Sequence, residues 1–233
     1  MVDAIVIERR FRGPPDSGNG GWTSGALAST LGMPAEVTLR RPPPLDVPLE
    51  VRCSGDRAVL LHGGEVVAEA VPDDGELEWP PFVPPEEAAA ATERYAGHRE
   101  HMFPSCFTCG TGRAEGDGLR IFAGPVAGAD RLVAAIWVPS AADAGADGLL
   151  PAPIVWAALD CPSVWPWLGD GTVALLGRMT ARVERTPTAG APYVVVGQGT
   201  GSEGRKRFGA AAIYGPDGTR HAVSRTTWIT VGG

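Results

Sequence analysis

PAPIVWAALDC (residues 151–161) and NGGWTSGALAS (residues 19–29) are the two segments that decide the fold, because they align without gaps as two copies of one helix. Both have the apolar spacing of a helix. Ala28 of the earlier copy aligns with Asp160 of the later copy. The later copy therefore carries an acid at a position where the earlier copy has only a methyl group.

The same order of predicted elements surrounds both copies. Each half reads as a strand, a loop, a helix and four further strands, which is typical of an antiparallel meander, and the second half has two strands before its helix. HGGE (62–65) and GPDG (215–218) predict tight turns between strands. The strands are predicted at residues 4–11, 35–41, 48–54, 57–63 and 65–71 in the first half, and at 118–124, 131–139, 172–186, 192–202, 206–215 and 219–231 in the second.

The composition changes after residue 71. Residues 72–104 contain several prolines, many acids and a short alanine-rich helical stretch, which predicts a linker across the surface. We therefore expect a first repeat at 1–71, a linker with a CFTCG loop at 72–117, and a second repeat at 118–233. An internal repeat of this size predicts two similar units, each covering an exposed surface of the other.

The composition and charge of the chain limit where the protein is expected to be located and what it is expected to bind. Hydrophobic residues make up 44% of the 233 residues, and the formal net charge is −7. An acidic chain is a poor partner for nucleic acid, although a local basic patch can still hold a small anion. No apolar run approaches the roughly 18–20 residues of a membrane span. Four cysteines without a secretion signal favour free thiols and a cytoplasmic location.

A helix followed by an antiparallel meander, twice in one chain, resembles the double hotdog fold of acyl-CoA thioesterases and their relatives. The resemblance covers nearly the whole chain and implies an α+β fold in which a curved antiparallel sheet wraps a long helix in each repeat. It implies an acyl-CoA or related thioester as the ligand. The segments that carry it are GNGGWTSGALAS, RRPPPLDVPLEV, HGGEVVAEA and VWAALDC.

The resemblance also implies an active site between the two repeats. Thioester hydrolysis needs a donor for the developing oxyanion and a carboxylate that attacks or activates water. By this resemblance Asp160 is the base or nucleophile, the N–H groups of Gly20 and Gly21 form the oxyanion hole, and Asn19 orients water or the carbonyl. Pro153, at the start of the later helix, has no N–H and is the worse donor.

Other interpretations of these residues stay open. A lone aspartate on a helix can cap a turn or pair with an arginine, and GNGG can be a plain loop. The chain also lacks a histidine before Gly20, which favours a rival function as an acyl-CoA or lipid-binding protein without turnover. A hydratase is disfavoured because the four histidines lie away from the helix starts, at His62, His98, His101 and His221.

Five further residues are candidates for substrate binding. Trp156 can shape an acyl tunnel and raise the pKa of the nearby acid by desolvation, although an indole is more often core material. Arg113 and Arg120 in a glycine-rich loop can meet CoA phosphates, or belong to a solvated loop. Arg205 and Lys206 form the densest basic cluster, with an exposed strand start as the alternative.

The CFTCG loop raises the question of a metal. Cys106 and Cys109, with His98 and His101 upstream, could bind zinc. Only one CxxC is present, and the histidines can lie on a solvated helix face. We therefore expect no metal and no cofactor, and a loop that closes over the helix pair and lines the ligand tunnel. We also expect a homodimer, because the outer sheet edges remain free for pairing.

Overall fold

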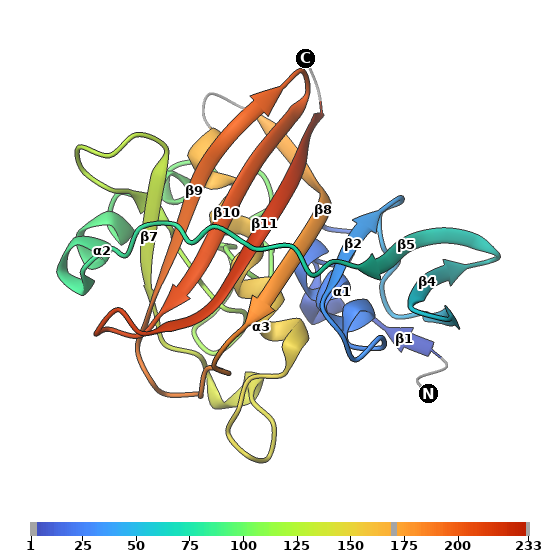
Figure 1. Cartoon of the computed structure of the whole chain (residues 1–233). Coiled ribbons are helices and arrows are strands. Elements are labelled where there is room, and N and C mark those ends of the chain that lie inside the picture. Colours follow the sequence, from blue (N-terminus) through green and yellow to red (C-terminus); the bar gives the residue numbers. More distant parts are fainter. Residues whose placement is uncertain (1–3, 169–171, 232–233) are drawn as a thin grey trace.

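One eleven-stranded antiparallel sheet runs through the computed structural model, which describes residues 4–168 and 172–231 (Figure 1). The outermost ends of the two expected repeats, residues 1–3 and 232–233, lie outside the described residues. The strands are β1 (Ala4–Val6), β2 (Ala35–Leu39), β3 (Pro48–Ser54), β4 (Arg57–His62), β5 (Glu65–Pro72), β6 (Gly124–Pro125), β7 (Leu132–Trp137), β8 (Val173–Val183), β9 (Tyr193–Glu203), β10 (Lys206–Tyr214) and β11 (Arg220–Val231).

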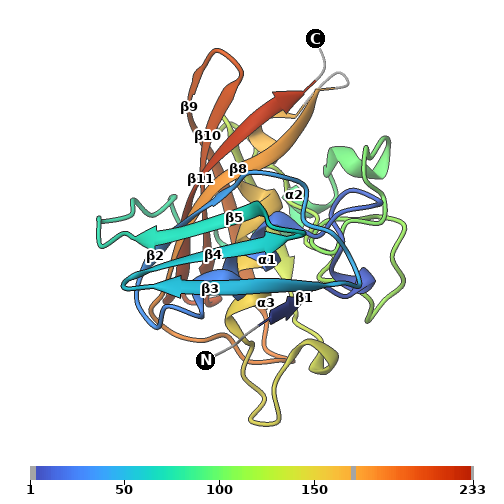
Figure 2. The same ribbon diagram turned by 90° about the vertical axis from the view of Figure 1, so that its right-hand side faces the viewer.

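The strand order displays the internal repeat. The first half is ordered β1-β3-β4-β5-β2. The second half, read from its far side, is ordered β7-β9-β10-β11-β8, with the two-residue β6 added outside β7. The halves join where β2 pairs antiparallel with β8, with Val37 opposite Met179. Figure 2 looks onto the strands of the first half, with the second half running away beside them. This is the α+β double hotdog architecture that the sequence predicts.

Two helices lie inside the curved sheet, and they pack directly on each other. These helices are α1 (Gly20–Ala28) and α3 (Ala152–Asp160). A Cβ on Gly21 would lie 2.6 Å from the Trp156 carbonyl oxygen, and one on Gly25 would lie 2.8 Å from the Trp156 Cβ. Because Gly21 also meets Asp160 while Gly25 meets Pro153, the helices run antiparallel. The start of α1 therefore lies beside the end of α3.

The remaining helical elements lie in the segments between the strands. The linker and the loop after it hold α2 (Pro85–Thr92) and the short 3₁₀ turn η2 (Ala96–His98). Four further 3₁₀ turns are η1 (Arg9–Phe11), η3 (Ala141–Asp143), η4 (Cys161–Ser163) and η5 (Trp165–Trp167).

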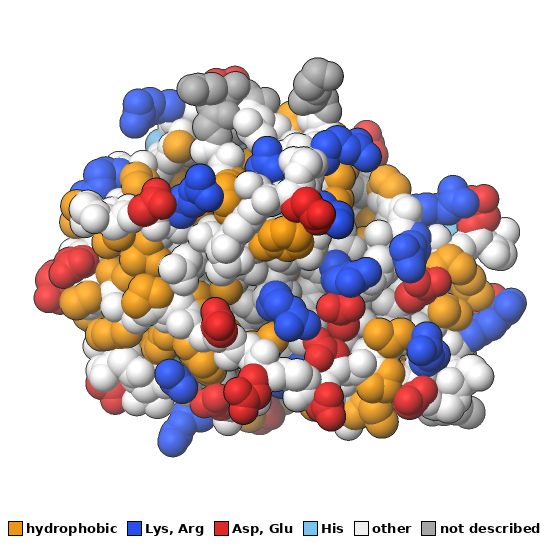
Figure 3. Space-filling view, turned by 45° about the horizontal axis from the view of Figure 1, so that its top comes forward, with side chains coloured by type: hydrophobic (Ala, Val, Ile, Leu, Met, Phe, Trp, Pro, Cys, Tyr) orange, Lys and Arg blue, Asp and Glu red, His pale blue; other side chains and the backbone are white. Residues whose placement is uncertain are grey.

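The segment after β5 crosses the outer face of the second half, as Figure 1 shows. It is fixed at its start by Asp73, which accepts hydrogen bonds from Thr180 (2.8 Å) and Arg225 (2.9 Å). Farther on, Trp79 and Phe82 pack on the Tyr214 ring. These contacts cover apolar strand surface that water would otherwise reach. On the face of the molecule shown in Figure 3, acidic and basic side chains are mixed.

Two stretches expected to be strands are not. Of residues 118–124, only Gly124 belongs to a strand, β6. Arg120 has a φ of 52°, and the Leu119 and Ile121 N–H groups bond to the CFTCG loop instead of to a neighbouring strand. Their alternating apolar side chains still enter the core. Residues 9–11 form a 3₁₀ turn instead of continuing β1.

The outer edges of the sheet are short. β1 has three residues and β6 has two, and α2 packs against β6. Short edges offer few free backbone groups for strand pairing with a second copy. No helix among the described residues is long and apolar enough to cross a membrane.

Candidate active site

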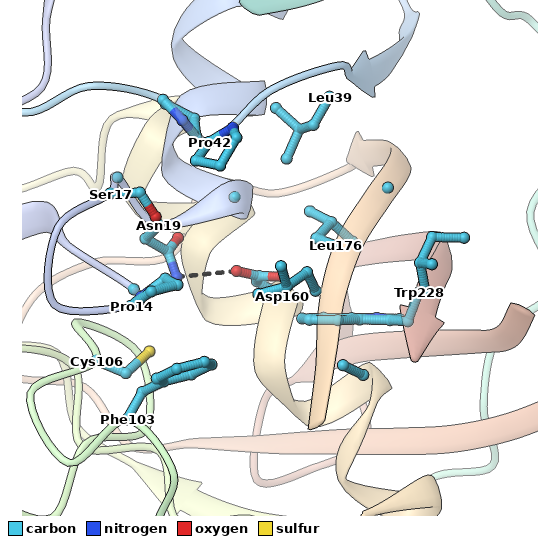
Figure 4. A pocket seen from close by; sticks show the side chains of 18 of the residues that line it. Pro14, Ser17, Asn19, Leu39, Pro42, Phe103, Cys106, Asp160, Leu176 and Trp228 are labelled. Atoms are coloured by element: carbon cyan, nitrogen blue, oxygen red, sulfur yellow. Dashed lines mark hydrogen bonds between the residues drawn. The ribbon is translucent and has the colours of Figure 1, made fainter. Parts of the chain in front are cut away.

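The carboxylate of Asp160 lies at the contact between the start of α1 and the end of α3 (Figure 4). The side chain is only 2% exposed. Its Oδ2 accepts hydrogen bonds from the Gly21 N–H (3.0 Å) and from the Asn19 side-chain amide (2.9 Å). The acid of the second half and the helix start of the first half therefore meet at one point. Both helices have nine residues and begin after Asn19 and Pro151, which matches the gap-free alignment of the sequence.

Helix capping fixes which way the Asn19 amide faces. Its Oδ1 accepts from the Trp22 N–H (2.8 Å), as an N-cap side chain does. The NH₂ group is thereby turned toward Asp160, with a longer contact to Thr108 Oγ1 (3.3 Å). Thr108 in turn donates to the Ala157 carbonyl (2.8 Å). The cap that starts α1 thus also orients a donor toward the acid.

The two oxygens of Asp160 differ in their surroundings. Oδ2 has two donors, whereas Oδ1 is buried and has no hydrogen-bond partner among the described residues. Burial raises the pKa of the Asp160 carboxyl to about 7, against the opposing effect of the Gly21 and Asn19 hydrogen bonds. A carboxyl with a pKa near neutrality is suited to accept a proton in a reaction.

Asp160 lines a cavity of about 580 Å³. Figure 4 shows that both halves of the chain and the CFTCG loop supply its walls. A second cavity of about 500 Å³ lies next to it, and the two share part of their lining. The side chains labelled in Figure 4 are Pro14, Ser17, Asn19, Leu39, Pro42, Phe103, Cys106, Asp160, Leu176 and Trp228. The lining common to both cavities is Phe103, Cys106, Cys161, Val173, Ala174 and Trp228.

Gly20 and Gly21, the first two residues of α1, have different surroundings. The Gly21 N–H, expected to bind an oxyanion, is already bonded to Asp160. Gly20 lies on the lining of the larger cavity and has a backbone N–H with no acceptor in its own helix.

The structure places the five candidate substrate-binding residues away from both cavities. Trp156 is buried between the helices, where its backbone and Cβ meet Gly21 and Gly25. Lys206 lies in the β9–β10 hairpin beside Arg205 and pairs with Glu203 (3.1 Å). None of these side chains lines either cavity.

Arg113 and Arg120 hold the loop itself. The Arg113 guanidinium is buried, donates to the Ser105 carbonyl (2.8 Å) and pairs with Asp117 (2.9 Å). Arg120 donates to the Arg113 carbonyl. These arginines therefore satisfy buried carbonyls in this structure, and neither lines the two cavities.

The sequence analysis missed the arginines that do line the larger cavity. These are Arg40 and Arg41, at the end of β2. Both are exposed, and they pair with Glu69 (2.7 Å) and Glu65 (3.0 Å). The signal was present in RRPPP, where two cations precede a rigid proline run that leads away from a strand.

The CFTCG loop gathers thiols instead of thiols and histidines. The Sγ atoms of Cys106, Cys109 and Cys161 lie within 4.8 Å of one another. His98 and His101 are not in this group: His98 packs on aromatic rings, and His101 Nε2 faces the Cys109 carbonyl (3.0 Å). Cys106 and Cys161 also line the larger cavity, so the loop contributes to its wall.

Comparisons with known proteins support the fold. No family model matches the sequence, and no curated protein matches it. Solved structures do match over nearly the whole chain. A conserved protein of unknown function with a hot dog fold from Alicyclobacillus acidocaldarius has a TM-score of 0.62 at 13% identity, covering 99% of this chain and 92% of its own.

Thioesterases are among the matching structures. An acyl-CoA thioesterase II, TesB2, from Mycobacterium marinum has a TM-score of 0.59 at 13% identity, covering 98% of this chain and 91% of its own. A tesB protein from Mycobacterium avium subs paratuberculosis has a TM-score of 0.59 at 14% identity, with 99% and 89% covered. The chain therefore has the double hotdog fold, and the structural resemblance to hotdog thioesterases expected from the sequence is confirmed.

Proposed function

We propose that this protein hydrolyses an acyl-CoA thioester in the larger cavity, with Asp160 as the general base. The two oxygens of Asp160 support this role. Two donors from the first half hold Oδ2 of Asp160, while Oδ1 has no partner among the described residues. A buried carboxylate with one oxygen fixed and the other free is arranged to take a proton from water.

The proposed reaction uses this chain's own groups. Water attacks the thioester carbonyl carbon and gives its proton to the Asp160 carboxylate. The Gly20 N–H, at the positive end of α1, stabilises the charge that develops on the carbonyl oxygen. The carbon–sulfur bond then breaks, and CoA leaves as a thiolate that acquires the proton. Asn19 and the Gly21 N–H act as positioning groups, because they touch the carboxylate and not the substrate.

The cavity walls support an orientation for the substrate. Arg40 and Arg41 lie on its lining and are exposed, so they are placed for the phosphates of CoA. Leu39, Leu176 and Trp228 give the wall near the acid an apolar character suited to the acyl group. The acyl chain extends from there toward the second cavity.

The test is release of CoA from a series of acyl-CoA esters of increasing chain length. Wild type is expected to hydrolyse at least one of them, and Asp160→Asn is expected to bind the same ester without turning it over. Wild-type protein that binds the esters but releases no CoA would contradict hydrolysis and favour the acyl-CoA or lipid-binding function. Thermal melts of both proteins control for folding.

A further inference from the structure

Three buried thiols converge where the CFTCG loop meets the end of α3. Cys106, Cys109 and Cys161 are each at most 7% exposed, and their Sγ atoms lie within 4.8 Å of one another. The Sγ atoms of Cys106 and Cys161 lie 3.6 Å apart. They come from segments 55 positions apart in the chain. Such convergence places three soft ligand atoms around one point.

The loop conformation presents the sulfurs together. The Gly110 N–H donates to the Cys106 carbonyl (2.9 Å), which closes a tight turn around the two cysteines. A Cβ on Gly110 would collide with the backbone of Pro104 and Cys106, so this turn needs a glycine. The N–H groups of Cys109 and Thr108 bond to the Cys106 sulfur. Backbone donors aimed at sulfur stabilise a thiolate, which is the form that binds metal.

The spacing of the sulfurs fits a metal better than a disulfide. A zinc–sulfur bond of about 2.3 Å gives a sulfur–sulfur edge of about 3.8 Å in a tetrahedron, close to the observed 3.6 Å. A disulfide needs about 2.05 Å, so the same two sulfurs would have to approach by a further ~1.6 Å.

Side chains next to the three cysteines bond to the CFTCG loop and pack against the thiols. The Cys109 carbonyl accepts from the Tyr95 hydroxyl (3.0 Å) and faces His101 Nε2 (3.0 Å). Phe103 and Trp165 pack against the same cluster. All three cysteines line the smaller cavity, which leaves space for a fourth ligand on that side. Outer partners of this kind orient metal ligands.

We propose that Cys106, Cys109 and Cys161 bind a zinc ion that ties the CFTCG loop to the end of α3, next to Asp160. The sequence alone predicts no metal and pairs Cys106 and Cys109 with histidines as the alternative. In the folded chain, Cys161 takes the place of those histidines. Binding releases the remaining thiol protons, and the ion fixes the segment that carries the acid.

The first experiment measures metal content in the full-length protein after reconstitution with zinc under reducing conditions. We expect about one zinc per chain, as a structural site requires. Cys109→Ser and Cys161→Ser should each lose it. Cys53→Ser is the matched control, because Cys53 is exposed and lies away from the cluster; this variant should keep the ion. Equal zinc in all four proteins, or zinc in none, overturns the proposal.

A second experiment uses wild type alone and does not depend on the variants folding. Cobalt added to the metal-free protein should give thiolate-to-cobalt charge-transfer absorption, and bound zinc should protect three of the four thiols from alkylation until a chelator is added. Cobalt without that absorption, or four thiols that react alike with zinc present, overturns the proposal. Neither readout involves acyl-CoA, so the outcome is independent of the hydrolysis test.

Discussion

α1 and α3 occupy equivalent places in the two halves and have the same length, yet their ends carry different chemistry. α1 begins with an asparagine cap and two glycines. α3 begins after Pro151 with no side-chain cap and ends with Asp160. Because the helices are antiparallel, the start of α1 meets the end of α3, and the start of α3 meets the end of α1. One crossing therefore has donors and an acid, and the other has Ala28 beside prolines.

A repeated fold can therefore contain a single site. The fold brings a helix start and a helix end together twice. Among the described residues, the crossing at Asn19, Gly21 and Asp160 combines a donor set, a carboxylate and a cavity that can hold a ligand. Small residues at that crossing allow the approach: a side chain on Gly21 would overlap Asp160 and Trp156.

Removing the acid should have the largest effect, because it makes the two helix crossings alike. Asp160→Asn should lower kcat/KM by at least ~100-fold, which is typical for loss of a general base. Its thermal unfolding should change little, because an amide of equal size still fills the site. Full activity in this variant would place the base elsewhere, and unfolding would make Asp160 a structural residue.

Moving the acid to the other crossing should not restore function. Ala28→Asp in the Asp160→Asn background places a carboxylate at the equivalent position of α1. Pro153 has no N–H, so this crossing lacks the donor that Gly21 supplies to Asp160. Hydrolysis should therefore stay at the level of the single variant in the same CoA-release assay. Recovery of activity would mean that the two crossings are equivalent.

Forcing the helices apart should cost both stability and activity. Gly21→Ala adds a Cβ 2.6 Å from Asp160 Cβ, and overpacking of this kind costs about 1–3 kcal/mol in unfolding free energy. Gly201→Ala is the control, because the nearest atom to its added Cβ is 3.6 Å away on Phe208. Denaturant unfolding of both variants measures the difference. Equal unfolding free energies would show that the helix contact is not tight.

The two roles of Asn19 can be separated by two substitutions. Asn19→Ser keeps a cap for α1 but removes the amide donor to Asp160, so we expect lower activity at nearly unchanged stability. Asn19→Ala removes both and should also lower the unfolding free energy by about 1 kcal/mol. Hydrolysis assays and denaturant unfolding distinguish them. Unchanged activity in both would remove Asn19 from the positioning of the acid.

The smallest expected effect is a change in the KM for acyl-CoA when basic residues are removed from one half or the other. Removing Arg40 and Arg41 together should raise the KM for acyl-CoA several-fold while kcat stays nearly constant. An exposed charge pair contributes about 1 kcal/mol of interaction free energy, which corresponds to a change of that size. A thioester without the nucleotide phosphates should be unaffected. The matched control removes Arg205 and Lys206 of the β9–β10 hairpin. A KM change in the control alone would move the phosphate contact to the second half.

Sequence alone determined the repeat, most strands, the register of the two helices and the acid. Alternating apolar residues, prolines and glycines are local signals. The ends of β3, β4 and β5 lie within one residue of the ends that these signals predict. The alignment of Asp160 against Ala28 needed only the two helical segments. These features depend on residues near one another in the chain.

Which distant groups meet depends on how the chain folds in three dimensions. Residues 118–124 have the apolar alternation of a strand, yet they bond to the CFTCG loop. Arg113 is cationic, yet it is buried against carbonyls, while Arg40 reaches the cavity. Cys161 joins two thiols from another segment. Local periodicity reports whether a residue is buried, but the partner that it contacts depends on how the two halves pack around their antiparallel helices.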